Sequence, residues 1–403
     1  MAEEPSLPCQ PRLLPNPYSN STPYPNPDQV FPDELTREIL LWLPVKSLMR
    51  FKCVSKLWLS ITLDPSFARA YRRGFRGLLL SDPYFERLAP TKDFFYVSLD
   101  GGQISHHLAV EHDGGRSLGY TEIVNGLVCF YYGNYSCLYN VATRESMELP
   151  RSEYGHSSAT YHLGFDPVDK LYKLLKICPV YSDDDYDGED LREATWLCNL
   201  DYSEILTIGT DASWRRIAPA PREMVERAVC LDGALYWLEN RIKNVGGFDG
   251  FLIAFHLAQE KFEFVPTPGR RLPYRLPYFG TRLSAITSYP KDGVIYSHGD
   301  GGWRVEHRFD MPQEPDHEFC AVGILPDGKV VIYESTGLLY FPSPFYLYDQ
   351  VEKKLTRIVI CRSPSSSSLE QRSKLLFQND ICGYLSYYEE NIIPLSYFAT
   401  PYP

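Results

Sequence analysis

The sequence predicts an all-β protein with a small N-terminal helical unit, and the β part is expected to close into a β-propeller of about six blades. Apolar residues recur at helical spacing between residues 31 and 71. From Gly74 onward, short runs of alternating apolar and polar residues recur, each beside a turn signal. An aromatic content of 14%, with 30 tyrosines among 403 residues, also favours strands.

Residues 1–30 form a Pro-rich tail that we expect to be disordered. Prolines lie at positions 5, 8, 11, 15, 17, 23, 25 and 27, among Asn, Ser and Tyr residues. Such a segment buries too little apolar surface to offset the entropy that it loses on ordering. A ligand for a Pro-binding domain is the alternative, although loose proline spacing is only a compositional signal.

The helical unit, residues 31–73, is expected to contain three short helices. Pro32 suits the start of the first helix, and Leu35, Ile39 and Leu43 then follow at four-residue spacing on one face. Pro44 ends this helix and begins the second. An Asp-Pro pair at positions 64 and 65 supplies the N-cap and first position of the third.

The charge of the helical unit differs from that of the rest of the chain. Basic residues outnumber acidic ones between residues 31 and 73, whereas the whole chain has a formal net charge of −11. A core this small is rarely stable alone. Two interpretations stay open: the unit binds an acidic partner with an apolar groove, or it packs against its own β domain.

Two kinds of β unit alternate along residues 74–403. The first is a Gly-containing turn followed by an apolar strand: NGLVCFYY from Asn125, DGALYWL from Asp232, DGVIYSH from Asp292 and DGKVVIY from Asp327. The second is a strand, a polar turn and another strand, beginning at Cys137, Ile205, Ile253 and Tyr346. Because such repeats cannot bury their faces alone, they predict a ring of four-stranded blades.

Composition excludes several classes of function. The charge of −11 opposes chain-wide binding to nucleic acid or to an anionic membrane. The start, MAEEPSLP, lacks the basic and then apolar pattern of a signal peptide, and no apolar run approaches a membrane span. The ten cysteines are scattered without a C-x-x-C pair, which favours free thiols. We therefore expect an intracellular protein of the cytoplasm or the nucleus.

No set of residues predicts catalysis, a metal site or a cofactor. The acidic segment 182–190 matches the start of a calcium-binding loop, but position 12 of that pattern is Ala194, which offers no side-chain ligand. We therefore expect an acidic surface loop. Motifs of nucleophilic, zinc-dependent or phosphate-binding sites are missing from the sequence, so the protein is expected to be non-catalytic.

The segment 270–282, RRLPYRLPYFGTR, is the candidate surface for binding a target protein. It places arginines and aromatic residues in a Pro-containing loop on an otherwise acidic β domain. Arg and Tyr dominate binding hot spots, and loops on rigid scaffolds often carry function. A connector whose aromatic residues pack inward is the alternative. The candidate residues are Arg270, Arg271, Tyr274, Arg275 and Tyr278.

The order of residues in the helical unit is specific enough to compare with known families. It runs Pro32, Leu35, Glu38-Ile39-Leu40, Leu43-Pro44, Lys46-Ser47-Leu48, Arg50-Phe51, Cys53-Val54-Ser55-Lys56, Trp58, Asp64-Pro65 and Phe67. This order resembles an F-box, in particular the plant type. The resemblance implies docking on the Skp-type adaptor of a cullin–RING ubiquitin ligase. The residues that it implies for this contact are Pro32, Leu35, Ile39, Leu40, Leu43, Pro44, Leu48, Phe51, Val54 and Trp58.

The β units YNVATRESMELP, GFDPVDKLYKLLKI, SWRRI and DGALYWL resemble the F-box-associated interaction domain of plant F-box proteins, which is similar to kelch propellers. The two resemblances imply a substrate receptor of a Skp–cullin–F-box ligase. The F-box would bind the adaptor, and through it the cullin and RING subunits, while the propeller would capture an unknown target for ubiquitination. An F-box scaffold outside a ligase is the alternative, and a propeller enzyme has only the fold in its favour.

Overall fold

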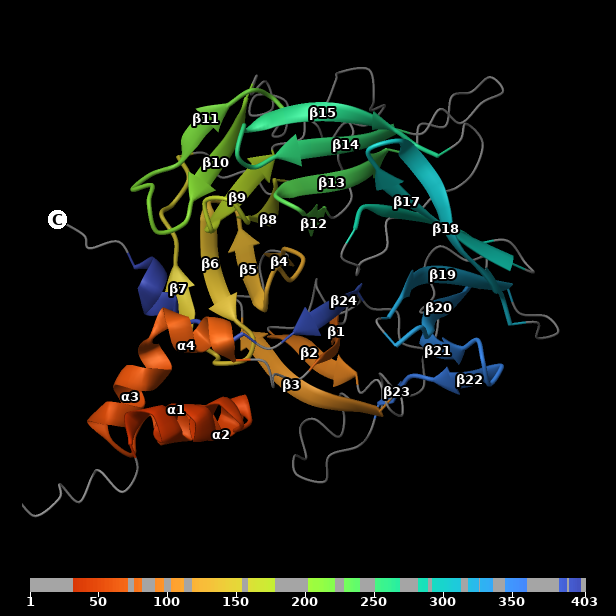
Figure 1. Ribbon diagram of the computed structural model, residues 1–403. Helices are drawn as coiled ribbons and strands as arrows, with labels where there is room; N and C mark the ends of the chain where they lie inside the picture. The colour runs from red at the N-terminus through yellow and green to blue at the C-terminus, as the bar shows by residue number, and fades with distance from the viewer. Residues whose placement is uncertain are drawn as a thin grey trace, which may run out of the picture.

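Figure 1 shows the computed structural model of the chain. The structure describes residues 32–71, 76–81, 91–97, 103–111, 118–153, 159–177, 202–221, 228–239, 251–268, 282–288, 292–312, 318–325, 327–335, 345–360, 384–389 and 391–399. The tail predicted at residues 1–30 and the domain boundary predicted between residues 73 and 74 lie outside these ranges.

Four helices form the N-terminal unit: α1 (Asp33–Leu41), α2 (Val45–Phe51), α3 (Lys56–Leu63) and α4 (Pro65–Ala70). The sequence predicts three, and the additional helix is α3. It begins because the Ser55 side chain accepts a hydrogen bond from the Trp58 N–H and so caps a new helix after α2. In the described part of the chain, no helix is long and apolar enough to span a membrane.

Within the described ranges, six sheets follow the helices. The first holds β1 (Arg76–Ser81), β2 (Thr91–Val97), β3 (Gln103–Glu111), β23 (Val359–Ile360) and β24 (Tyr384–Glu389). The second holds β4 (Gly119–Tyr120), β5 (Leu127–Tyr132), β6 (Tyr135–Asn140) and β7 (Ser146–Glu148), and the third holds β8 (Thr160–Asp166), β9 (Leu171–Ile177), β10 (Ser203–Thr207) and β11 (Arg215–Ile217).

The remaining sheets complete the β domain. They hold β12 (Val229–Leu231), β13 (Ala234–Glu239), β14 (Phe251–His256) and β15 (Lys261–Pro266); then β16 (Ser284–Ser288), β17 (Asp292–Gly299) and β18 (Gly302–Asp310); and last β19 (Glu318–Ile324), β20 (Val330–Ser335), β21 (Phe345–Asp349) and β22 (Lys354–Arg357). A short 3₁₀ helix, η3 (Leu395–Phe398), lies near the C-terminus.

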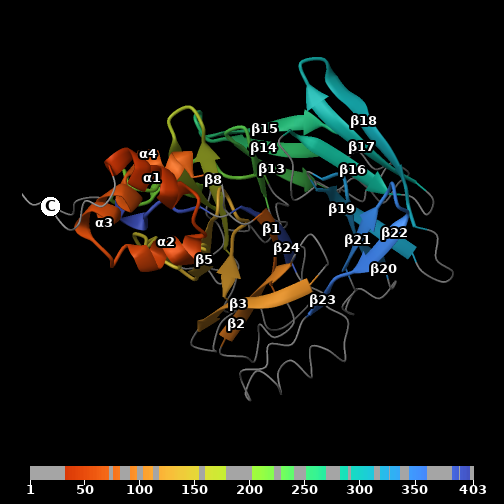
Figure 2. The same cartoon turned by 60° about the horizontal axis from the view of Figure 1, so that its bottom comes forward.

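The sheets surround a common centre in sequence order, as Figures 1 and 2 show. Within each four-stranded sheet, neighbouring strands are consecutive in the chain. The first sheet closes the ring, because C-terminal β24 pairs with N-terminal β1. The prediction of an all-β propeller of about six blades behind an N-terminal helical unit is confirmed.

Both kinds of predicted turn are present. Glycine turns join β4 to β5, β12 to β13 and β19 to β20, with positive φ at Gly126, Gly233 and Gly328. The glycine turn expected at Asp292 is wrong, because Asp292 and Gly293 are the first two residues of β17 and pair with neighbouring strands. Glycine is needed at position 293 because the Phe309 ring covers the place that a side chain would take.

Apolar side chains fill the space between neighbouring sheets. Leu127 and Leu138 pack with Leu163 and Leu174 between the second and third sheets. Ile205 and its neighbours form the same kind of core between the third and fourth sheets. These neighbouring blades therefore depend on one another for burial, as the repeat pattern predicts.

Candidate functional site

The helical unit has a core of its own. Leu40, Leu48 and Phe67 are fully buried in one apolar cluster from α1, α2 and α4. The Tyr71 hydroxyl donates a hydrogen bond of 2.8 Å to the Leu43 carbonyl, which ties the end of α4 to the loop after α1. This core sets which side chains of the unit point outward.

Polar contacts fix α4 against α1. The Asp64 carboxylate accepts hydrogen bonds from the Ser66 N–H and hydroxyl, both at 2.7 Å, and the Arg37 guanidinium lies 3.4 Å from it. These Ser66 hydrogen bonds, helped by Arg37, lower the pKa of Asp64. Arg37 also lies over the Phe67 ring, 5.4 Å from its centroid. The helices therefore form one ordered unit.

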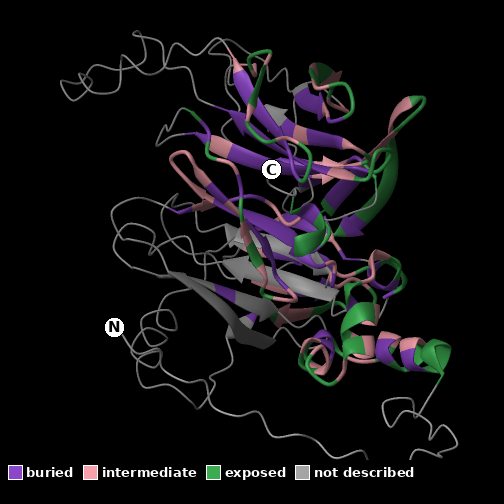
Figure 3. Ribbon diagram, turned by 90° about the vertical axis from the view of Figure 1, so that its left-hand side faces the viewer, coloured by how far each residue is buried: buried purple, intermediate pink, exposed green. Residues whose placement is uncertain are grey.

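An apolar surface remains open on this unit. Leu35 and Ile39, on one face of α1, are 52% and 45% exposed, and Val54, after α2, is 59% exposed. Figure 3 shows the exposed side of these helices in green. Several half-exposed large apolar side chains on one small unit make that unit a candidate for protein binding. We call Leu35, Ile39 and Val54 the open F-box face.

The predicted adaptor-contact residues fall into three groups. Pro32, Leu35, Ile39, Pro44 and Val54 are exposed, and Leu43, Phe51 and Trp58 are partly buried. Leu40 and Leu48 are buried inside the unit, so they can support the surface but do not lie on it. Contact of the predicted residues with an adaptor stays a prediction, in which these two leucines act from beneath the surface.

Sequence reasoning missed three exposed apolar side chains on the same unit. Trp42 in the turn after α1 is 58% exposed, and Leu59 and Leu63 on α3 are 37% and 39% exposed. Trp42 follows Ile39 by three residues, so helical spacing was a usable signal. Leu59 and Leu63 were missed because α3 was not expected, so no helical spacing linked them to Trp58, the predicted contact residue on the same helix.

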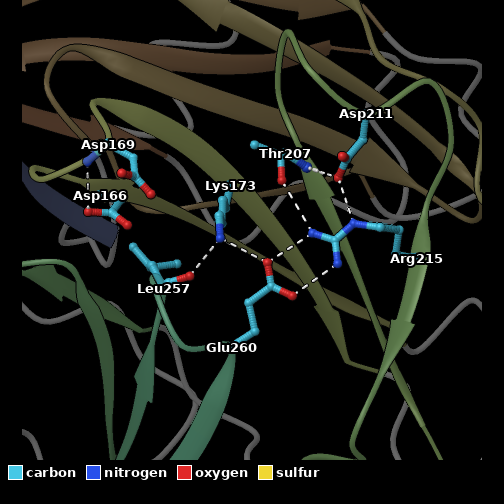
Figure 4. A network of polar contacts seen from close by, with 8 residues as sticks. All are labelled: Asp166, Asp169, Lys173, Thr207, Asp211, Arg215, Leu257 and Glu260. Carbon is cyan, nitrogen blue, oxygen red and sulfur yellow. Dashed lines mark hydrogen bonds and ion pairs between the residues drawn. The ribbon is translucent and has the colours of Figure 1, made fainter.

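A network of charged side chains joins two blades of the propeller (Figure 4). The Arg215 guanidinium donates two hydrogen bonds, of 2.9 and 3.0 Å, to the two oxygens of Glu260, and Lys173 Nζ donates one of 2.8 Å. The hydrogen bonds from Arg215, and then those from Lys173, lower the pKa of Glu260 to about 2. Asp211 holds Arg215 from the other side at 3.0 Å.

A second polar group is buried within the third blade. Lys176 Nζ lies 2.7 Å from Glu204 Oε2, and the Ser152 hydroxyl donates a hydrogen bond of 2.6 Å to the same oxygen. Lys176 is fully buried and Glu204 is 5% exposed. In both groups the charged atoms are paired with one another, which is how structural ion pairs are built.

The cysteines that the structure describes are free thiols, including two whose pKa is raised by burial. Cys53, Cys129, Cys137, Cys230 and Cys320 are free cysteines, and the prediction of ten free thiols stays untested for the others. Burial raises the pKa of Cys129 and raises that of Cys230 to about 11. Among the described residues, no group of three or more His, Cys, Asp or Glu side chains could hold a metal ion.

Two predicted loops lie outside the described residues. These are the acidic segment 182–190 and the candidate target residues Arg270, Arg271, Tyr274, Arg275 and Tyr278. The ends that flank the second loop are described. The Trp303 indole N–H donates to the carbonyl of Pro266, the last residue of β15, and β16 begins at Ser284.

Comparison with known proteins agrees with both parts of the fold. The model of the F-box domain matches residues 30–69, and the model of the F-box associated beta propeller domain matches residues 94–381. "Putative F-box protein At3g52320" of Arabidopsis thaliana is 25% identical over 375 residues, covering 86% of this chain and 91% of its own. "F-box/kelch-repeat protein At4g19930" of the same plant is 30% identical over 272 residues, covering 60% and 58%.

Other matches are more limited. "Putative F-box protein At1g47790" of Arabidopsis thaliana is 28% identical over 257 residues, and the match spans 60% of each chain. Among solved structures, TolB from Acinetobacter baumannii matches 70% of this chain and 63% of its own, with a TM-score of 0.37 and 10% identity. The fold assignment therefore rests on the sheets and on the family match. The chain belongs to the family of F-box proteins with an F-box-associated β-propeller domain.

Proposed function

We propose that the protein is a non-catalytic substrate receptor of a Skp–cullin–F-box ubiquitin ligase. The F-box binds a Skp-type adaptor, and the propeller binds a target protein. The receptor makes and breaks no bonds. It raises the effective concentration of target lysines near the conjugating enzyme, which the cullin and RING subunits bring to the complex. Such a receptor works inside the cell, in the cytoplasm or the nucleus.

The open F-box face carries this proposal. Leu35, Ile39 and Val54 are each about half exposed on a folded unit whose core is already filled by other residues. Apolar side chains that the fold itself does not need are explained by a partner with an apolar groove. Leu40 and Leu48 support this face from beneath.

We propose the Arg-Tyr segment 270–282 as part of the target surface. Its N-terminal flank, the end of β15, lies at the end of its sheet opposite the β14–β15 turn, because Lys261 pairs with His256 and Pro266 pairs with Phe251. The corresponding β6–β7 turn lies beside the F-box, where Glu145 pairs with Lys52. A target bound beside the described end of β15 would then approach the propeller from the face opposite the F-box.

The test is adaptor binding by a pair of matched variants. Val54→Asp places a charge on the open F-box face, whereas Val168→Asp makes the same change at a valine that is 81% exposed in a propeller turn. In a pull-down with a purified Skp-type adaptor, we expect Val54→Asp to weaken binding by tenfold or more and Val168→Asp to leave it unchanged. An apolar contact of about 1.5–3 kcal/mol gives this loss.

Two results would count against the proposal. Equal adaptor binding by both variants and the parent would remove the role of the open F-box face. Adaptor binding without co-purification of a cullin would favour a scaffold that acts outside a ubiquitin ligase.

A further inference from the structure

We propose that residues 391–399, which we call the C-terminal clamp, fix the F-box on the propeller in one orientation. The clamp contains η3 and follows β24, the strand that closes the ring. In Figure 1 it is the dark-blue short helix beside α4 and β7. The inference concerns contacts within the chain, and only its consequence for ubiquitin transfer rests on the proposed function.

One end of the clamp is part of the F-box core. Ile392 is 2% exposed and belongs to the same apolar cluster as Leu40, Leu48 and Phe67. Ile393 packs against the margin of this cluster, together with Ala142 of the propeller. The small core of the helical unit is thus extended by apolar side chains from the C-terminal clamp. This added burial explains how so small a unit is stabilised.

The other end of the clamp is part of the propeller core. Leu395 and Phe398 are 3% and 8% exposed and belong to the cluster between the second and third sheets. The Phe398 ring meets the Tyr172 ring edge-on, with centroids 5.4 Å apart. Gly209 allows this approach: its φ is +80°, and a Cβ there would lie 3.1 Å from the Phe398 carbonyl oxygen.

The β6–β7 turn joins the clamp and the F-box through polar contacts. One oxygen of Glu145 accepts a hydrogen bond of 2.9 Å from the Leu395 N–H, and the other lies 3.1 Å from Lys52 Nζ of the F-box. At the start of the same turn, the Asn140 side chain donates a hydrogen bond of 3.1 Å to the Ile393 carbonyl. A single carboxylate therefore contacts both the clamp and the F-box.

The clamp leaves the open F-box face accessible. Ile392 is buried in the cluster of Leu40, Leu48 and Phe67, whereas Leu35, Ile39 and Val54 stay about half exposed with the clamp in place. The clamp therefore does not compete with a partner on that face. It acts as a positioning element that sets the orientation of an adaptor-bound F-box relative to the propeller.

The test asks whether the two parts stay together once the covalent link is cut. A site for a specific protease is inserted between Arg73 and Gly74 of the full chain, and the folded protein is cleaved and passed over a sizing column. We expect the fragment 1–73 to elute with the propeller. Separation of the two fragments from the parent protein would overturn the proposal.

Single substitutions then test whether the clamp is what keeps the fragment 1–73 bound to the propeller. Ile392→Ser should raise the dissociation constant of the fragment roughly tenfold or more, because it removes a buried apolar contact. Gly209→Val should act in the same direction by displacing Phe398, from a site in the propeller turn after β10. Tyr397→Ser is the matched control, since Tyr397 lies in the same segment but is 61% exposed.

Further outcomes separate the alternatives. Circular dichroism and a melting curve show whether each variant propeller is folded. If Ile392→Ser does not fold, Gly209→Val provides the same comparison for the clamp, and Lys52→Met tests the contact between the F-box and Glu145. Retention that is unchanged in every folded clamp variant would show that the clamp does not hold the F-box, whatever the adaptor pull-down shows.

Discussion

Replacing Glu260 with Gln tests whether the network between the third and fourth blades stabilises the propeller. Gln keeps the size and shape of the side chain but removes the charge. Glu260 accepts a bidentate pair of hydrogen bonds from Arg215, and it lies 2.8 Å from Lys173, whose side chain is 9% exposed. The change therefore deprives a largely buried ammonium group of its anionic partner, although the Leu257 carbonyl still accepts its hydrogen bond of 2.7 Å.

The pKa of Glu260 gives the magnitude. Lowering it from 4.5 to about 2 corresponds to at most about 3–4 kcal/mol of stabilisation at neutral pH. Arg215 is 43% exposed, so solvent screening reduces this value, and we expect a loss of about 1–2 kcal/mol in the free energy of unfolding. Because the pKa is lower in the folded state, the contribution is fully present above about pH 5 and is lost as the pH falls from 4.5 towards 2.

Urea denaturation at pH 7 and at a series of lower pH values measures this effect. Glu306→Gln is the matched control, because Glu306 is an exposed residue of β18. The difference between parent and Glu260→Gln should be largest at pH 7 and should shrink as the pH falls below 4.5. A difference that is absent at pH 7, or that stays constant down to pH 3, would refute this account of the network.

Two further predictions concern buried groups. Lys176→Met alone should cost about 3–5 kcal/mol in urea denaturation, since it leaves the buried Glu204 carboxylate uncompensated, and adding Glu204→Leu should restore most of the loss. In thiol labelling of the folded protein, Cys53 should react rapidly because it is exposed, whereas Cys129 and Cys230 should react only after unfolding. Rapid labelling of Cys129 would contradict the packing of the second blade.

Local chemistry explains what the sequence predicted well. The Asn-Gly turn at position 125 places its glycine at a φ of 78°, and the Asp-Gly turn at 232 does the same. The Asp64 cap with Pro65 begins a helix as expected. These signals act over a few residues, so they can be read without knowing the fold.

Contacts between distant parts of the chain explain what the sequence could not predict. The Lys52–Glu145 pair spans 93 residues, and the hydrogen bond from Asn140 to Ile393 spans 253. No spacing rule connects such positions. The same limit applies to the F-box contact residues, because their apolar pattern does not say that Leu40 faces inward while Ile39 faces outward.

One recurring turn illustrates how the propeller combines a local rule with distant partners. In the turns after β6, β14 and β21, a residue in the left-handed region, Arg144, Glu260 or Lys353, stands at the same place. Glu260 reaches back to the preceding blade, and Lys353 does so too, through an ion pair of 2.7 Å with Asp310. In the second blade the residue after Arg144, Glu145, instead holds the F-box and the clamp. The three turns share this backbone conformation, but their charged residues form ion pairs with different parts of the chain. In the second blade the partner is Lys52 of the F-box. The same kind of turn that joins two blades elsewhere therefore joins the propeller to the F-box here.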